Sequence, residues 1–297
     1  PVTPRNVTKR LVPIKEIKPP IDEIGGCKLE KLLGKGAMGA VFLGYHAGFD
    51  QQLAVKLLPE ERTKNGRFVD LFLKEARSLV KIAHENVVRV FNVGEEKGQY
   101  FIAMELVEGS DLGNLIKSEK TVEPKRAAKM IADAASGLHA AHREGMVHRD
   151  VKPDNLMITN AGIVKVADFG LAIESADGKK ASFKKQNIVG TPYYMPPEQV
   201  DGEPSDARAD IYSLGCTLYH ALTGEVPYRG KTLMDILVKH VNAAPPNPKE
   251  RNSKVPDGLA QICLKMMAKA PGDRYPDMLA TADALSKFYR GESVSNT

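Results

Sequence analysis

The 297-residue chain has few cysteines and no long hydrophobic run. Its three cysteines, Cys27, Cys216 and Cys263, are far apart in the sequence and form no Cys-x-x-Cys pair. This pattern excludes a disulfide framework and favours a reducing compartment, so we expect a cytoplasmic protein. The most apolar stretch, Ile211–Leu222, is far shorter than the roughly 20 residues that a membrane-spanning helix needs. The sequence therefore predicts no transmembrane segment.

The chain also lacks a strong excess of charge of either sign. It contains 42 Lys and Arg against 37 Asp and Glu, a net charge of +5, and the basic residues form no long run. This argues against a nucleic-acid-binding protein. The shares of hydrophobic (42%) and charged (27%) residues are those of an ordinary soluble globular protein. The chain starts at Pro1 without a signal-peptide pattern, which favours a segment of a longer protein.

Strand-like periodicity dominates the first third of the chain. After a proline-rich stretch, residues 27–58 alternate apolar and polar side chains between glycine-containing breaks, which predicts three antiparallel strands. A helix is predicted over 68–82, and two further strands over 87–93 and 100–106. The sequence therefore predicts a small five-stranded antiparallel β lobe with one helix.

Beyond residue 108 the pattern becomes mainly helical, which predicts a larger second lobe and a bilobal α+β fold. The helices of this lobe are predicted at 124–143, 207–223, 232–240, 256–267 and 276–289, and short strands at 156–158 and 164–166. The predicted divisions of the chain are an extended N-terminal arm (1–25), the small lobe (26–107), the large lobe (108–290) and a flexible tail (291–297).

A glycine-rich segment, G-K-G-A-M-G, starts at Gly34 and includes Gly36 and Gly39. Strand patterns lie on both sides of it, whereas a dinucleotide-binding glycine motif of the same spacing opens a helix. The arrangement favours a β-hairpin whose backbone N–H groups approach the phosphates of a nucleotide. A glycine-containing hairpin without a ligand is the alternative that this motif alone leaves open.

Lys56 interrupts an apolar strand, L-A-V-K-L-L, where a buried charge without a partner would be costly. Glu75, on the predicted helix that follows, offers a carboxylate. Paired with Glu75, the Lys56 ammonium would be held toward the α- and β-phosphates of ATP. A lysine that faces solvent from an edge strand is the alternative for this residue taken by itself.

The segment H-R-D-V-K-P-D-N, His148–Asn155, collects three side chains suited to phosphoryl transfer. Asp150 can accept the proton of an attacking hydroxyl, Lys152 can lie against the γ-phosphate, and Asn155 offers an oxygen to Mg²⁺. Asp168 of the D-F-G tripeptide follows a predicted strand and would bind Mg²⁺ as well. A polar loop shaped by proline and turn-forming residues is the alternative reading of the first segment.

In the order of these motifs the chain resembles the eukaryotic-like, or Hanks-type, serine/threonine protein kinases, from about Leu29 to Tyr289. Lys152 and the segment G-T-P-Y-Y-M-P-P-E, Gly190–Glu198, are similar to the serine/threonine rather than the tyrosine branch. The resemblance implies an enzyme that transfers the γ-phosphate of ATP to Ser and Thr hydroxyls of proteins, a non-specific serine/threonine protein kinase. It implies ATP and Mg²⁺ as cofactors, with Mn²⁺ as an alternative metal.

The resemblance also implies roles for single residues. The adenine would lie between Val41, Ala54 and Met157, Met104 would be the gatekeeper, and Asp111 would contact the ribose. The implied catalytic residues are Asp150, Lys152, Lys56, Glu75 and Thr191. The implied nucleotide contacts are Gly34, Lys35, Gly36, Ala37, Met38, Gly39, Val41, Ala54, Lys56, Met104, Glu105, Val107, Asp111, Met157 and Asp168, and the metal ligands are Asn155 and Asp168.

Four further implications concern the scaffold of the site. The resemblance implies that Thr191 supports Asp150 and Lys152. It also implies an ion pair of Glu198 with Arg274, a bond from Asp210 to the backbone of the H-R-D loop, and a hydrophobic stack formed by Leu79, Val90, His148 and Phe169.

The departures from the family pattern are informative. Pro196 stands where these kinases usually carry Ala before Pro-Glu, and Tyr212 stands where many eukaryotic members carry Trp, which favours a bacterial member. Leu71 and Ile173 replace basic residues that often hold a loop phosphate. We therefore expect autophosphorylation, with Ser182 as the favoured site, to change activity only modestly.

The expected partners are protein substrates carrying Ser or Thr and, for autophosphorylation in trans, a second copy of the chain. No nucleic acid is expected, and a membrane only through segments outside this chain, as in the cytoplasmic domain of a receptor-like kinase. Two alternatives remain: an ATP-binding pseudokinase scaffold, and a small-molecule phosphotransferase. The intact Lys56, Asp150 and Asp168 argue against the first, and the long segment between Asp168 and Glu198 argues against the second.

Overall fold

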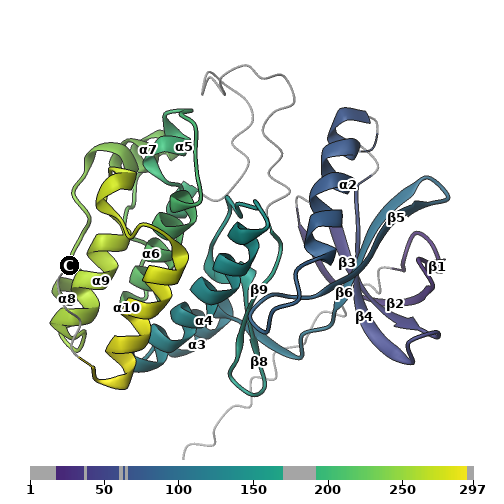
Figure 1. Cartoon of the computed structure of the whole chain (residues 1–297), viewed down its shortest axis with the longest axis horizontal. Helices are drawn as coiled ribbons and strands as arrows, with labels where there is room; N and C mark the ends of the chain where they lie inside the picture. Colours follow the sequence, from purple (N-terminus) through teal and green to yellow (C-terminus); the bar gives the residue numbers. More distant parts are fainter. Residues whose placement is uncertain (1–17, 37–38, 60–62, 64–65, 170–191, 293–297) are drawn as a thin grey trace, which may run out of the picture.

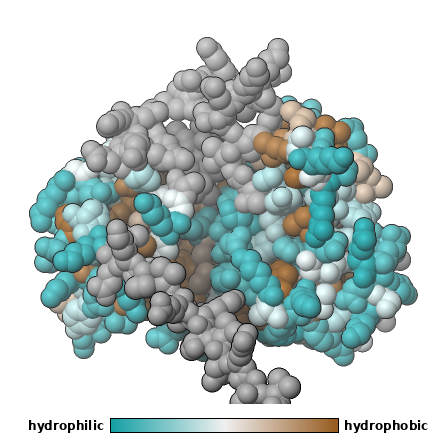
Figure 2. Space-filling model, turned by 180° about the vertical axis from the view of Figure 1, so that it is seen from behind, coloured by the Kyte–Doolittle hydropathy of each residue, from teal (hydrophilic) through white to brown (hydrophobic). Residues whose placement is uncertain are grey.

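The computed structural model describes residues 18–36, 39–59, 63, 66–169 and 192–292, without the side chains of residues 67, 68, 71, 74 and 75. These residues form two lobes with helices gathered in one and a twisted sheet in the other (Figure 1). The predicted bilobal α+β fold is confirmed. In the space-filling view most of the described surface is hydrophilic, and a recess separates the lobes (Figure 2).

The small lobe is an antiparallel sheet in the order β1-β2-β3-β4-β6-β5, with helix α2 (Gly66–Val80) packed beside it (Figure 1). The two faces of the sheet pack into two different hydrophobic cores, because successive side chains of a strand point to opposite sides. In β4, for example, Leu53 and Val55 are buried in a small core on one face, whereas Ala54 belongs to the main core that continues into the large lobe. The strands are β1 (Glu23–Ile24), β2 (Cys27–Gly36), β3 (Gly39–His46), β4 (Gln51–Leu57), β5 (Val90–Glu96) and β6 (Gln99–Glu105).

Strand β1 was not predicted, and it raises the number of strands in the small lobe from five to six. Its two residues lie in the stretch predicted as an extended arm (1–25), yet Ile24 pairs with Cys27 and is fully buried. Gly25 and Gly26 both have positive φ and form the tight turn between the two strands. A strand of two residues is too short to show a period in the sequence, so only the turn could have revealed it.

The large lobe surrounds helix α6 (Arg208–Thr223), in which 13 of 16 residues are buried. This explains the apolar stretch Ile211–Leu222 as the centre of a core. The bounds predicted for α4 (Pro124–Arg143) are those of the structure: its N-cap Glu123 accepts from two backbone N–H groups, and Pro124 occupies the first turn. The other helices are α3 (Leu112–Glu119), α5 (Pro197–Val200), α7 (Leu233–Asn242), α8 (Pro248–Arg251), α9 (Asp257–Met266) and α10 (Met278–Arg290), with 3₁₀ turns η1 (Pro153–Asn155), η2 (Pro192–Tyr194) and η3 (Pro271–Asp273).

Helices α3, α5 and α8 were not predicted, because each is too short for apolar periodicity to appear. A three-stranded sheet made of β7 (Gly109–Asp111), β8 (Leu156–Thr159) and β9 (Val164–Val166) lies between the lobes (Figure 1). In the part of the chain that the structure describes, no helix has the length and apolar character needed to cross a bilayer.

A backbone junction ties the small lobe to β9. The N–H of Val88 donates to Val166 O at 2.9 Å, and the N–H of Val166 donates to Asn86 O at 2.8 Å. Asn86 also packs on helix α4: a Cβ at Gly137 would stand 2.2 Å from the Asn86 carbonyl oxygen. Glycine at position 137 therefore permits the close approach that fixes the two lobes at this point.

Candidate active site

The glycine-rich segment forms the tip of the β2–β3 hairpin, as the sequence predicts. A Cβ at Gly39, where φ is +127°, would stand 2.0 Å from the carbonyl oxygen of Leu57, so the fold itself requires glycine there. Gly34 and Gly36 differ, because no heavy atom lies within 4 Å of the Cβ position. Gly34, Lys35 and Gly36 are all exposed, so the backbone of this segment is open to a ligand. Residues 37 and 38 (Ala37 and Met38) lie outside the described residues.

Lys56 is only 4% exposed, and its Nζ lies 2.8 Å from Oδ1 of Asp168. Burial of Asp168 works against its ionisation, but the charge and hydrogen bond of Lys56, together with neighbouring charges such as that of Lys152, lower the pKa of the carboxyl. The carboxylate is therefore charged at neutral pH, and 44% of the side chain stays exposed. Glu75 lies on α2, but its side chain is not described, so its pairing with Lys56 stays a prediction.

The H-R-D loop brings three predicted site residues together. Nζ of Lys152 lies 2.5 Å from Oδ2 of Asp150, and Nδ2 of Asn155 donates to the Asp150 carbonyl oxygen at 2.8 Å. This bond turns the amide nitrogen of Asn155 toward the loop and leaves its Oδ1 available. The N–H of Ala167 donates to Asn155 O at 2.9 Å, which fixes the backbone next to Asp168. This hydrogen bond thus links Asn155 to the residue before Asp168. Both predicted metal ligands offer the hard oxygen atoms that suit Mg²⁺.

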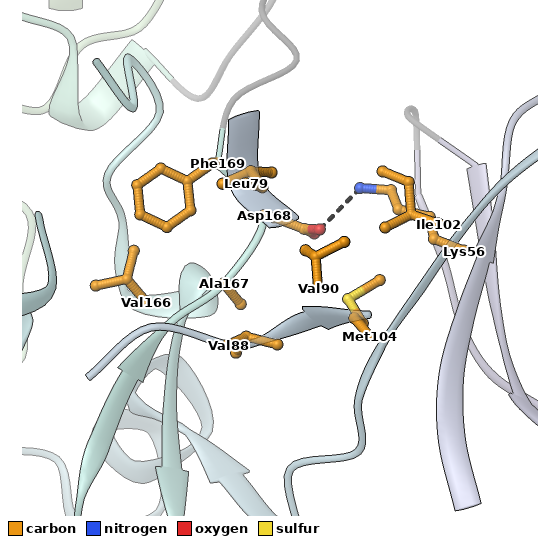
Figure 3. Close-up of a pocket in the computed structure, with 10 residues that line it drawn as sticks. All are labelled: Lys56, Leu79, Val88, Val90, Ile102, Met104, Val166, Ala167, Asp168 and Phe169. Atoms are coloured by element: carbon orange, nitrogen blue, oxygen red, sulfur yellow. Dashed lines mark hydrogen bonds and ion pairs between the residues drawn. The ribbon is translucent and has the colours of Figure 1, made fainter. Parts of the chain in front are cut away.

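His148 is fully buried and links the H-R-D loop to the D-F-G segment. Its Nδ1 accepts from the backbone N–H of Asp150 at 3.2 Å, so in the neutral ring Nε2 carries the proton and donates to Ala167 O at 3.0 Å. The His148 ring lies 4.9 Å from the ring of Phe169. Phe169 lines one cavity together with Leu79 and Val90 (Figure 3). The four residues predicted to form a hydrophobic stack are therefore gathered in one place.

Asp210, fully buried at the start of α6, holds the H-R-D loop in place. Its carboxylate accepts from the backbone N–H groups of His148 and Arg149, each at 2.8 Å, as the sequence predicts. Arg149 has a φ of +63°, a conformation that costs energy for a residue with a side chain. A third partner was not predicted: Nε2 of His142, on α4, lies 2.8 Å from Oδ2 of Asp210. No local pattern pairs positions 68 residues apart, so the sequence alone did not reveal it.

A cavity of about 30 Å³ lies beside the Lys56–Asp168 pair. Apolar side chains from both lobes form the rest of its wall, among them Met104, the predicted gatekeeper (Figure 3). Met104 pairs with Ala54 across β4 and β6, so their side chains leave the same face of the sheet. The cavity thus has a charged end and an apolar end.

The remaining residues predicted around adenine lie at the edges of this region. Val41 of β3 and Met157 of β8 are partly buried and pack against the main core. Glu105 ends β6, and Val107 lies in the short connection to β7. Val41, Val107 and Met157 therefore pack against the main core shared by the lobes, whereas contact of these residues with a nucleotide stays a prediction.

Residues 27–286 match the family model described as the protein kinase domain. The chain belongs to the protein kinase family. The serine/threonine-protein kinase PknB of Mycobacterium tuberculosis (strain H37Rv) is 36% identical over 269 residues, or 89% of this chain. A probable serine/threonine-protein kinase, CA_C1728 of Clostridium acetobutylicum, is 37% identical over 87% of this chain. The chain spans 43% and 39% of the length of these two proteins.

A solved structure that resembles the fold of this chain is a kinase domain as well. The crystal structure of the Mycobacterium tuberculosis PknI kinase domain matches with a TM-score of 0.70 and 28% identity, over 89% of this chain and 97% of that chain. The predicted resemblance to bacterial Hanks-type serine/threonine kinases is confirmed, since these relatives come from bacteria and are named serine/threonine-protein kinase or probable serine/threonine-protein kinase.

In this protein kinase domain Asp111, the predicted ribose contact, is the N-cap of α3. Its Oδ1 accepts from the backbone N–H of Asn114 at 2.8 Å, and its Oδ2 accepts from the Asn114 side chain at 2.5 Å. Capping fixes the carboxylate at the start of α3 before any ligand arrives. A contact of Asp111 with a ribose stays a prediction.

The predicted ion pair of Glu198 with Arg274 is present and buried. The Arg274 guanidinium donates to both carboxylate oxygens of Glu198, at 2.7 and 2.8 Å. Its remaining N–H groups donate to the carbonyl oxygens of Arg208, Ala268 and Lys269, so all five donors are used. The pair anchors the segment that leads out of residues 170–191. Thr191 itself lies outside the described residues.

Proposed function

We propose that this chain is an active serine/threonine protein kinase that transfers the γ-phosphoryl group of Mg-ATP to Ser and Thr hydroxyls of proteins. The observation that carries the proposal is the position of Asp150. Lys152 contacts its carboxylate at 2.5 Å, and its loop is fixed by Asn155 on one side and by Asp210 on the other. A carboxylate held in this way can accept a proton while a lysine faces the transferred group.

The proposed reaction is a direct displacement in which the substrate hydroxyl attacks the γ-phosphorus. The proton of the hydroxyl passes to Asp150, the bond to the β-phosphate oxygen breaks, and ADP leaves, so no covalent enzyme intermediate is needed. Lys152 would stabilise the charge on the transferred group, and Lys56 would hold the α- and β-phosphates. A bound Mg²⁺, held by Asn155 and Asp168, would supply charge neutralisation between the phosphates. The open backbone at Gly34 and Gly36 supports phosphates approaching from the small lobe.

The contacts that hold Asp150 and Lys152 also favour catalysis over a scaffold role. A protein that only binds ATP has no use for a carboxylate beside Lys152, whereas both catalytic groups are held here within hydrogen-bond distance. As further parts of the proposal, the chain acts on the cytoplasmic side of the cell and phosphorylates itself in trans. Ser182, the favoured acceptor, lies outside the described residues.

The test is mass spectrometry of the purified chain after incubation with Mg-ATP and a generic basic protein. We expect phosphate on Ser and Thr of the added protein, on Ser182 of the chain, and not on small alcohols offered in its place. In the variant Asp150→Asn, turnover should fall by about 10²–10⁴ because the proton acceptor is lost, with little change in ATP affinity.

Transfer by Asp150→Asn at the rate of the unmodified chain would contradict the role of Asp150. Transfer to small alcohols rather than to protein would favour the small-molecule phosphotransferase, and ATP binding without transfer would favour the scaffold. If Ser182→Ala leaves loop phosphorylation unchanged, Ser182 is not the main autophosphorylation site.

A further inference from the structure

An ion pair joins the end of the small-lobe sheet to the small sheet between the lobes. The Lys165 ammonium lies 3.0 Å from Oε1 and 3.1 Å from Oε2 of Glu105, so it bridges both carboxylate oxygens. The two side chains are only 15% and 26% exposed, so solvent screens this pair less than pairs on the surface. Glu105 is the last residue of β6, where the chain passes to the large lobe, and Lys165 lies in β9.

Backbone hydrogen bonds on both sides reinforce the pair. Oε2 of Glu105 accepts from the N–H of Arg89 at 3.2 Å, and the N–H of Glu105 donates to Arg89 O at 2.8 Å. The residue before Arg89, Val88, donates to the carbonyl oxygen of Val166, the residue after Lys165. The ion pair therefore closes a ring made of the end of β6, the two residues before β5, and β9, so a shift of one of these segments would break bonds to the others.

The ring lies on the outside of the cavity wall. Met104, Val88 and Val90 line the cavity, as Figure 3 shows. Successive side chains of an extended strand point to opposite faces, so Glu105 and Arg89 lie on the far side of that wall. The side chains of Glu105 and Arg89 are thus kept away from the apolar wall of this cavity.

Lys165 also connects to the opposite side of the predicted adenine site. It pairs with Met157 across β8 and β9, so the two side chains leave the same face of this sheet. Asp168 lies three residues after Lys165 in the chain. We propose that the Glu105–Lys165 pair is a positioning pair: it holds the end of β6 at a fixed spacing from the β8–β9 sheet, which carries Met157 and leads to Asp168, and so sets the affinity for the nucleoside. This inference rests on the proposed function.

The test measures the affinity for adenosine and for Mg-ADP by calorimetry, using the whole chain. Adenosine has no phosphates and needs no metal, so it reports only the spacing of the adenine site. The variant Lys165→Met keeps most of the length of the unbranched side chain and removes the charge. We expect its affinity for both ligands to fall by roughly 3- to 10-fold, the range typical of mutations in a coupling network, with KM for ATP raised more than kcat is lowered.

Three further variants make the comparison specific. Lys165→Arg keeps the charge and should keep the affinity. Glu105→Gln should lose as much affinity as Lys165→Met, and the double variant should lose no more than either single one, because both remove one interaction. Lys129→Met is the matched control: Lys129 pairs with Asp133 at 2.9 Å on the surface of α4, and its loss should leave both affinities unchanged.

Two results would overturn the inference. One is wild-type affinity for adenosine in Lys165→Met together with a lower melting temperature, which would make the pair only structural. The other is a double variant whose loss of affinity equals the sum of the losses of Lys165→Met and Glu105→Gln, which would show that the two residues act separately. Should Lys165→Met not fold, the nearly isosteric Glu105→Gln decides by the same measurement. An unmodified chain that binds adenosine but transfers no phosphate would refute the proposed function and leave this comparison intact.

Discussion

The substitution Asp210→Asn tests how firmly the H-R-D loop must be held. The buried carboxylate of Asp210 accepts from three donors, two of them backbone N–H groups. An asparagine of the same shape has one oxygen and one NH₂ group. If its oxygen faces His148 and His142, the NH₂ group meets the N–H of Arg149. If the amide is turned the other way, the NH₂ group meets the N–H of His148. In either orientation at least one backbone N–H loses its acceptor.

The magnitude follows from this geometry. A lost bond to a charged acceptor costs about 1.5–3 kcal/mol, and the bond to Arg149 also stabilises its positive φ. We therefore expect the catalytic conformation of the loop to be destabilised by about 2–3 kcal/mol, which corresponds to a fall in kcat of roughly 30- to 150-fold. ATP affinity should change little, because Asp210 lies in α6 and holds the residues next to Asp150 rather than the nucleotide contacts.

Steady-state kinetics with a protein substrate gives kcat and KM, and calorimetry with Mg-ADP gives the affinity. Asp133→Asn is the matched control, since Asp133 pairs with Lys129 on the surface, where such a pair contributes little. A kcat for Asp210→Asn equal to that of the control would refute the reasoning. So would an equal loss of Mg-ADP affinity, because the effect would then not be confined to the loop.

Three other substitutions have expected outcomes of different kinds. Asp168→Asn should weaken binding of Mg-ADP and leave adenosine affinity unchanged, since a neutral amide is a poorer ligand for Mg²⁺; equal Mg-ADP affinities in a calorimetric titration would remove Asp168 from the metal site. Arg274→Met should lower the free energy of unfolding by about 3–5 kcal/mol in urea denaturation, because Glu198 would stay buried without its partner. A loss as small as that of a surface ion pair would contradict this account. Burial, with the nearby charge of Lys269, lowers the pKa of His240 to about 3. The unfolded chain binds a proton at His240 below about pH 6.5 and the folded chain does not, so stability should fall as the pH drops, by about 2 kcal/mol at pH 5. The carboxyl groups with lowered pKa act only at lower pH, but burial also lowers the pKa of His220, so His220 contributes to the same slope. His240→Gln should therefore make the slope between pH 7 and 5 clearly shallower, and an unchanged slope would show that His240 is not a source of it.

The sequence by itself determined the parts of this protein that local chemistry dictates. The change from period 2 to period 3.6 near residue 108 separated the lobes, and a proline at the first turn fixed the start of α4 (Pro124–Arg143) at its observed residue. The motifs carried the same kind of information. Gly39 must be glycine because of its backbone, and Asp150, Lys152 and Asn155 lie together because they share one loop.

The tertiary structure alone decided the pairs between distant positions. His142 meets Asp210 across 68 residues and Lys165 meets Glu105 across 60, and neither pair has a local pattern. Lys56 contacts Asp168, 112 residues away, although the sequence predicts Glu75 on the next helix as a partner. A local pattern records which face of an element is apolar and where its backbone must turn. Which charged side chain lies opposite another depends on how the elements pack, because only packing removes water and brings the two groups within hydrogen-bond distance.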